Sequence, residues 1–173
     1  MRRLRAPIAT MVFGASLVLM GRTASAVDIS GTISTTLIIT EDSQLVGNVT
    51  CTVTGAPCIA FGASGVALTL NGFSITGQAD AVTGCAGSQT AGEHGILVNG
   101  LRGVVIRRPG IVQRFRAFGI MLNGGSSRVL VARVTVSTNC MSGIFVTQAS
   151  SDNELEANIA VRNGNATAAC GGI

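Results

Sequence analysis

Gly-Ile pairs recur along this chain at a nearly constant interval, and short apolar runs follow them. The pairs begin at Gly95, Gly119, Gly143 and Gly172, which are separated by 24, 24 and 29 residues. Each of the first three pairs opens a run of β-favouring apolar residues. A fixed period in this range is typical of stacked repeats, so each interval is expected to form one coil of a β-solenoid.

Within each interval, short β-favouring runs alternate with turns rich in Gly, Asn, Ser and Thr, without the 3.6-residue period of an amphipathic helix. The pattern predicts an all-β fold of about five to six coils, stabilised coil by coil. When Ile59 is aligned with Ile96, Leu68–Leu70 falls opposite Val104–Ile106. Successive side chains of a strand point to opposite faces, so the expected strands around Val131 and Leu155 should each have an inward and an outward set of side chains. The inward set is Val129, Val131 and Leu155, and the outward set is Leu130, Ala132, Glu154 and Glu156.

One interval is longer than the others. Ile59 and Ile96 are 37 residues apart, about thirteen more than one coil requires. The surplus falls in residues 78–94, which are rich in Gly, Ala and Thr. We expect this segment to be a loop that leaves the solenoid wall.

The N-terminal segment has the layout of a bacterial-type secretory signal peptide. Basic residues precede an apolar stretch from Ile8 to Met20, and Ala24-Ser25-Ala26 follows as a cleavage site. We expect residues 1–26 to be removed, leaving residues 27–173 as one secreted or periplasmic domain without a membrane span. Because four of the twelve basic residues lie in the removed segment, the mature chain holds eight Arg against eight acids. This balance argues against nucleic acid as a partner.

Five cysteines in an exported chain indicate disulfides. Cys51 and Cys58 close a small loop, and Cys140 and Cys170 precede successive Gly-Ile pairs. Equivalent positions on adjacent coils lie about 4.8 Å apart, which a disulfide accepts. We therefore expect both pairs, with Cys85 left over, although Cys140 and Cys170 as stacked thiols remain an alternative.

Two stretches resemble a known family. Residues 68–77 (LTLNGFSITG), preceded by Cys58, and the pattern Asn153-x-Leu155-x-x-Asn158-x-Ala160-x-x-Asn163 are similar to bacterial exported right-handed parallel β-helix repeat proteins of the pectin-lyase-like fold. The resemblance covers about Ile29 to Ile173 and implies a right-handed β-helix. The family includes polysaccharide lyases, glycosidases and non-catalytic proteins, and the matched residues are stacking and turn residues, so no catalytic residue is implied.

Arginine is concentrated around one coil. Guanidinium groups suit carboxylate, sulfate and phosphate, so this band is a candidate site for an anionic glycan. The alternative is a coil whose outward residues happen to be Arg, partly neutralised by neighbouring acids. The band consists of Arg102, Arg107, Arg108, Arg114 and Arg116.

Three carboxylates, Asp152, Glu154 and Glu156, have the spacing that places side chains on one face of a strand. Oxygen ligands of this kind could hold Ca²⁺, the one cofactor that the sequence suggests. The simpler interpretation is a solvated face on which Asp152 pairs with Arg128. Glu93-His94, the only His site, is a further acid–base candidate, against the commoner role of a turn residue.

Three functions follow as hypotheses. The first is a non-catalytic module that binds an acidic polysaccharide or another extracellular partner. The second is a polysaccharide lyase or related carbohydrate-active enzyme that uses Arg107 or Arg108 with the three carboxylates. The third is a structural module that associates end to end. The chain stops after Cys170-Gly-Gly-Ile173 has begun a new coil, so we expect a C-terminally incomplete solenoid, and an open end covered by another subunit is the alternative.

Overall fold

The computed structural model describes residues 25–82, 85, 91–164 and 173. Within these residues the protein is all β, with short strands joined by turns and no helix that could cross a membrane. The predicted signal peptide lies almost entirely outside the described residues. The strands are β1 (Val27–Ile33), β2 (Leu37–Ile39), β3 (Ser43–Cys51), β4 (Ile59–Phe61), β5 (Ala67–Thr69), β6 (Ser74–Thr76), β7 (Ile96–Asn99), β8 (Val105–Arg107), β9 (Ile111–Gln113), β10 (Ile120–Asn123), β11 (Leu130–Ala132), β12 (Thr135–Ser137), β13 (Ile144–Val146), β14 (Glu154–Glu156) and β15 (Ile159–Val161).

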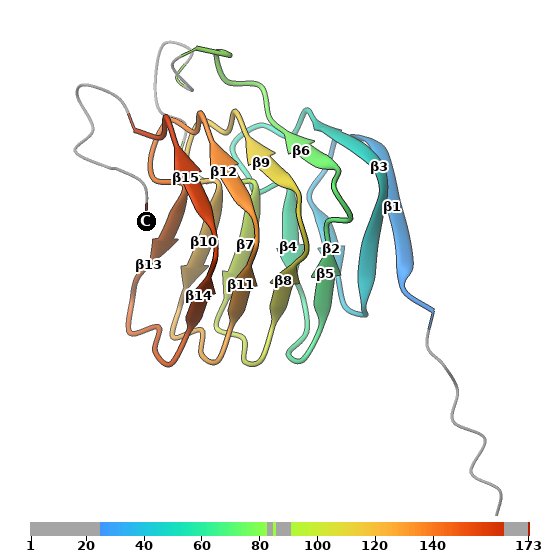
Figure 1. The fold of residues 1–173 in the computed structure, drawn as a ribbon, viewed down its shortest axis with the longest axis vertical. Helices are drawn as coiled ribbons and strands as arrows, with labels where there is room; N and C mark the ends of the chain where they lie inside the picture. The colour runs from blue at the N-terminus through green and yellow to red at the C-terminus, as the bar shows by residue number, and fades with distance from the viewer. Residues whose placement is uncertain (1–24, 83–84, 86–90, 165–172) are drawn as a thin grey trace, which may run out of the picture.

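Strands far apart in sequence lie side by side because the chain returns to the same position on every coil (Figure 1). Coil 1 holds β2 and β3, and coils 2 to 5 hold β4–β6, β7–β9, β10–β12 and β13–β15. One sheet has the order β13-β10-β7-β4-β2. The other has two arms that meet at the long strand β3: a first arm of β5, β8, β11 and β14, and a second arm of β6, β9, β12 and β15. Every pairing is parallel, as a β-solenoid requires.

The register of the first sheet matches the periodic pattern of the sequence. Ile59 pairs with Ile96, Ile96 with Ile120, and Ile120 with Ile144, and all four are buried. In the first arm, however, Leu68 pairs with Ile106, not with Val104 as expected. From Ile59 to Leu68 the chain advances nine positions, whereas from Ile96 to Ile106, the residues paired with them, it advances ten. The error is two residues, and an even shift keeps every side chain on its predicted face.

The core is formed by columns of inward side chains from successive coils. Leu68, Ile106 and Val131 form one fully buried column in the first arm, and Leu155 of coil 5 packs against the core. Complete burial of such a side chain contributes about 1.5–3 kcal/mol. Each coil therefore depends on its neighbours for most of its stabilisation.

The glycines of the Gly-Ile pairs are required by close contact between coils. A Cβ atom on Gly95 would lie 2.5 Å from the carbonyl oxygen of Gly119, and one on Gly119 would lie 2.6 Å from that of Gly143. The carbonyl of the next coil occupies the space of a side chain at each position. This contact gives the repeating Gly a physical cause that the sequence pattern alone did not reveal.

Asparagine side chains tie each coil to the one before it. The Asn158 carbonyl oxygen accepts from the Val134 backbone N–H at 3.0 Å, and its amide nitrogen donates to the Val131 carbonyl at 2.7 Å. Asn139, Asn153 and Asn163 make the same pair of bonds. The amides thereby satisfy backbone groups that turns leave without partners in the sheets.

The described part of the long segment, residues 78–82, 85 and 91–94, contains no strand. Cys85 is bonded to Cys140 on coil 4, with a Cα–Cα distance of 4.7 Å. The expected pairing of Cys140 with Cys170 is therefore corrected, and Cys170 lies outside the described residues. The expected disulfide between Cys51 and Cys58 is present, with a Cα–Cα distance of 5.9 Å.

Replacement of Asn139 by Ala should lower the free energy of unfolding by about 2 kcal/mol, because it leaves buried backbone groups of Phe115 and Val112 without partners. Urea denaturation measures this change. Asn99→Ala is the matched control, since Asn99 is exposed, and its effect should stay within about 0.5 kcal/mol. Equal losses in the two variants would contradict the bonding role of the Asn139 amide.

Candidate functional site

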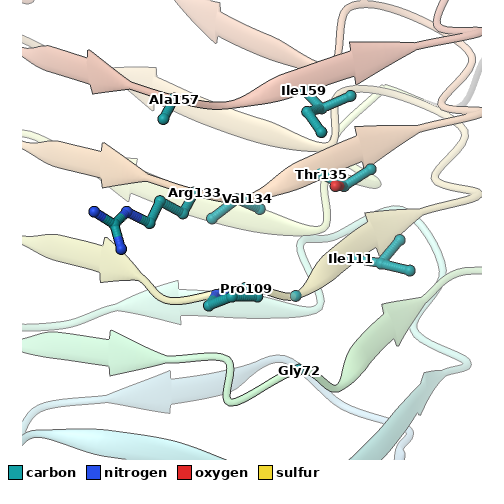
Figure 2. A pocket seen from close by; sticks show the side chains of 9 residues that line it. Gly72, Pro109, Ile111, Arg133, Val134, Thr135, Ala157 and Ile159 are labelled. Carbon is teal, nitrogen blue, oxygen red and sulfur yellow. The ribbon is translucent and has the colours of Figure 1, made fainter.

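A trough crosses the outer wall of the second sheet where the first arm bends into the second. It combines two adjoining hollows of about 350 and 230 Å³, which share Pro109 and Arg133. Figure 2 shows the larger of the two. Its floor belongs to coil 4, and its walls are side chains of coils 3 and 5. The side chains that define the trough are Arg107, Arg108, Pro109, Ile111, Ala132, Arg133, Thr135, Glu156, Ala157 and Ile159.

The charged end of the trough results from a small residue between two long ones. Ala132 pairs with Arg107 on one side and with Glu156 on the other. Neighbouring strands lie about 4.8 Å apart, so the backbones that carry Arg107 and Glu156 are separated by about 9.6 Å. Because Ala132 fills little of this interval, a hollow remains above it.

The apolar end is built in the same way. Thr135 pairs with Ile111 of coil 3 and with Ile159 of coil 5. Figure 2 shows these three side chains in a row on neighbouring strands. Ile111 is 37 % exposed and Ile159 is 59 % exposed, so both present apolar surface to solvent beside the shorter threonine.

The bend between the arms places an arginine in the middle of the trough. Arg108, Arg133 and Ala157 adopt positive φ angles of 73°, 58° and 50°, a conformation that turns the chain sharply at one residue. Coil 3 has one residue more between β8 and β9 than coil 4 has between β11 and β12. This extra residue lets Pro109 form part of the wall. The Arg133 guanidinium points away from the row of Ile111, Thr135 and Ile159 (Figure 2).

The trough therefore offers three kinds of contact. Arg107, Arg108 and Arg133 are exposed and supply cationic donors, and Glu156 is an exposed acceptor. Guanidinium forks bind carboxylate, sulfate or phosphate groups with directed hydrogen bonds. A ligand with an anionic group, hydroxyl donors and apolar surface matches this set.

The structure divides the predicted arginine band. Arg107 and Arg108 line the trough, whereas Arg102 lies on the turn before β8, outside the trough residues. Arg114 donates from Nε to the carbonyl of Ala79 at 2.9 Å, and Arg116 binds Glu93. The last two arginines hold the long segment against the wall.

Arg133 belongs to the trough and was absent from the predicted band. Ala132 pairs with Arg107, so the next residue, Arg133, occupies on coil 4 the position that Arg108 occupies on coil 3. Alignment of the coils contained this signal, but a search for arginines clustered in sequence does not detect it.

The three carboxylates of the proposed Ca²⁺ site are not brought together. Glu154 and Glu156 belong to β14, whereas Asp152 lies in the preceding turn with a φ of 54°. Across the described part of the chain, no three acidic, His or Cys side chains form a cluster suited to a metal ion. Arg128 and Asp152 form no ion pair either.

Glu93 makes contacts that fix the long segment. Its carboxylate, which is 5 % exposed, receives two bonds from Arg116, Nε to Oε2 at 2.5 Å and Nη2 to Oε1 at 2.8 Å. The backbone N–H of Gly55 donates to the same carboxylate at 2.8 Å. A buried charge held by this many donors acts as a structural anchor.

His94 is buried beside two aromatic rings. Its imidazole stacks on Phe118 at 5.4 Å between ring centroids, and Phe118 stacks on Phe145 at 4.4 Å. Burial lowers the pKa of His94 from 6.5 to about 4, because the charged imidazolium would lose its hydration. The predicted acid–base pair therefore consists of an anchored carboxylate and an imidazole that is neutral near pH 7.

Comparisons with protein families, curated proteins and solved structures found no match for this chain. The interpretation of the trough therefore depends on its own chemistry.

Acidification should destabilise the protein through His94. Its folded-state pKa of about 4 lies below the ordinary value of 6.5, so the unfolded chain binds the proton first as the pH falls. The stability that neutral His94 contributes is complete above pH 6.5 and is lost down to about pH 4, by at most about 3 kcal/mol. The chain has one His, so NMR can follow its imidazole alone. A His94→Gln variant should lose this part of the pH dependence, and a titration midpoint near 6.5 in the folded protein would contradict the prediction.

Proposed function

We propose that this protein is an exported, non-catalytic module that binds an anionic polysaccharide in the trough. The observation that carries the proposal is the convergence of Arg107, Arg108 and Arg133 on one hollow that also holds Glu156. These residues come from three successive coils, so the site exists only in the folded stack. Sugar acids combine the anionic group, the hydroxyl donors and the apolar ring faces that the trough complements.

The chemistry of the trough suits a weak and salt-sensitive interaction. Its charges are exposed, and an exposed ion pair contributes about 0–1 kcal/mol. A polysaccharide repeats its charged unit, however, and can compensate for low affinity at one site by engaging several copies of the protein. Among the described residues that line the trough, the carboxylate is Glu156 alone, whereas glycoside hydrolysis uses two. This composition favours binding over hydrolysis.

The proposal includes export and a right-handed β-helix. Two disulfides are consistent with an oxidising, extracellular environment, and the first 26 residues resemble a secretory signal. Parallel strands in one sheet are joined by right-handed crossovers in nearly all proteins. The resemblance to right-handed β-helix repeat proteins supports the same hand.

The combined substitution Arg108→Gln and Arg133→Gln should weaken binding of polygalacturonate or alginate at least tenfold at low salt, because it removes two of the three cationic groups. Isothermal titration calorimetry or affinity electrophoresis measures the change. Wild-type binding should also fall as salt is raised.

Arg128→Gln is the matched control. Arg128 is exposed on coil 4 with a φ of 54°, close to the 58° of Arg133, but lies outside the trough. Its removal should leave affinity unchanged. The proposal fails if the wild-type protein does not bind at low salt or if Arg128→Gln weakens binding as much as the double variant.

A further inference from the structure

We infer that the polysaccharide bound in the trough carries O-acetyl groups next to its anionic groups, and that the apolar end of the trough recognises them. This inference rests on the proposed function and adds to it the chemical class of the ligand. It arises from the part of the trough that an unsubstituted sugar acid leaves unused.

The apolar end is a separate and larger hollow than the charged end. Its volume is about 350 Å³, against about 230 Å³ at the charged end. Ile111 and Ile159 lie on either side of Thr135 on neighbouring strands, and Pro109 and Ala157 close the hollow toward the bend. At the same strand position on coil 2, the chain has Ser74. Two exposed isoleucines on coils 3 and 5 thus form a local apolar feature of an otherwise mixed surface.

The distance between the two ends limits what can occupy them together. Thr135, on the floor of the apolar end, lies three positions after Ala132, on the floor of the charged end. At about 3.3 Å per residue, the two floors lie within about 10 Å of each other. A group in the apolar end must therefore belong to the same sugar unit as the bound anion or to its neighbour.

The residues around the apolar end favour an acetyl ester over a free hydroxyl. A sugar hydroxyl could bond the Thr135 hydroxyl, but it would leave the apolar surfaces of Ile111 and Ile159 in contact with water. An acetyl methyl group instead buries apolar surface against Ile111 and Ile159. The Thr135 hydroxyl lies between the isoleucines and can donate to the acetyl carbonyl.

Charge distinguishes an O-acetyl group from a methyl ester. Esterification of the sugar carboxylate by methanol would also supply a methyl group, but it removes the negative charge that Arg107, Arg108 and Arg133 attract. An O-acetyl group adds the methyl and leaves the carboxylate ionised. Both ends of the trough are then satisfied by one substituted sugar acid.

The test compares polygalacturonate of one chain length, unmodified and chemically O-acetylated, in calorimetric titrations with the full chain. The wild-type protein should bind the acetylated form at least fivefold more tightly. Ile159→Ser should remove this preference while retaining affinity for the unmodified form, and Thr135→Val should reduce the preference through loss of the hydroxyl. Should Ile159→Ser fail to fold, Ile159→Thr keeps the β-branched shape and tests the same contact.

Ile38→Ser is the matched control, because Ile38 is 63 % exposed on β2 and lies outside the trough. It should keep the full preference for the acetylated form. Equal affinity of the wild-type protein for both forms overturns the inference and leaves the proposed function standing. Absence of binding to either form overturns the proposed function and the inference together.

Discussion

Parallel, in-register stacking of coils is the constraint on which the rest of this structure depends. Each inward position must hold a side chain that packs on its counterparts one coil before and one coil after, as Ile96, Ile120 and Ile144 do. Gly95 and Gly119 leave space for the carbonyl of the next coil, and Asn amides bond the turns of successive coils. A defect in one coil therefore acts on its neighbours, because no coil has a core of its own.

The same stacking produces the trough. Outward positions do not take part in the core, so their side chains can differ from coil to coil without loss of packing. Long side chains on coils 3 and 5 flank Ala132 and Thr135 on coil 4, and the depression between them runs along one coil. The rigid sheet behind it fixes the spacing of the arginines, while the Cys85–Cys140 disulfide and the Glu93–Arg116 ion pair hold the long segment to the wall.

The periodic part of the structure could be predicted from the sequence, whereas the parts that break the period could not. Inward columns and the Gly-Ile register repeat, and they follow from the spacing of apolar residues. Leu68 was misplaced by two residues because turn length varies between coils without a hydrophobic signal. Cys140 bonds to a cysteine in the non-periodic segment, which an argument from adjacent coils cannot reach. Arg133, which is distant in sequence from Arg107 and Arg108, lies beside them because the coils stack in register. Arg114 and Arg116, which belong to the predicted band, anchor the long segment instead.

The most direct test of the central claim is to map where an anionic oligosaccharide contacts the folded protein. NMR spectra of the isotope-labelled protein, titrated with oligogalacturonate, report this residue by residue. The account predicts shifts concentrated at Arg107, Arg108, Ala132 and Arg133, on the outer face of the second sheet. Shifts concentrated instead at Leu97, Met121 and Phe145 of the five-stranded sheet, or no shifts at low salt, would contradict it.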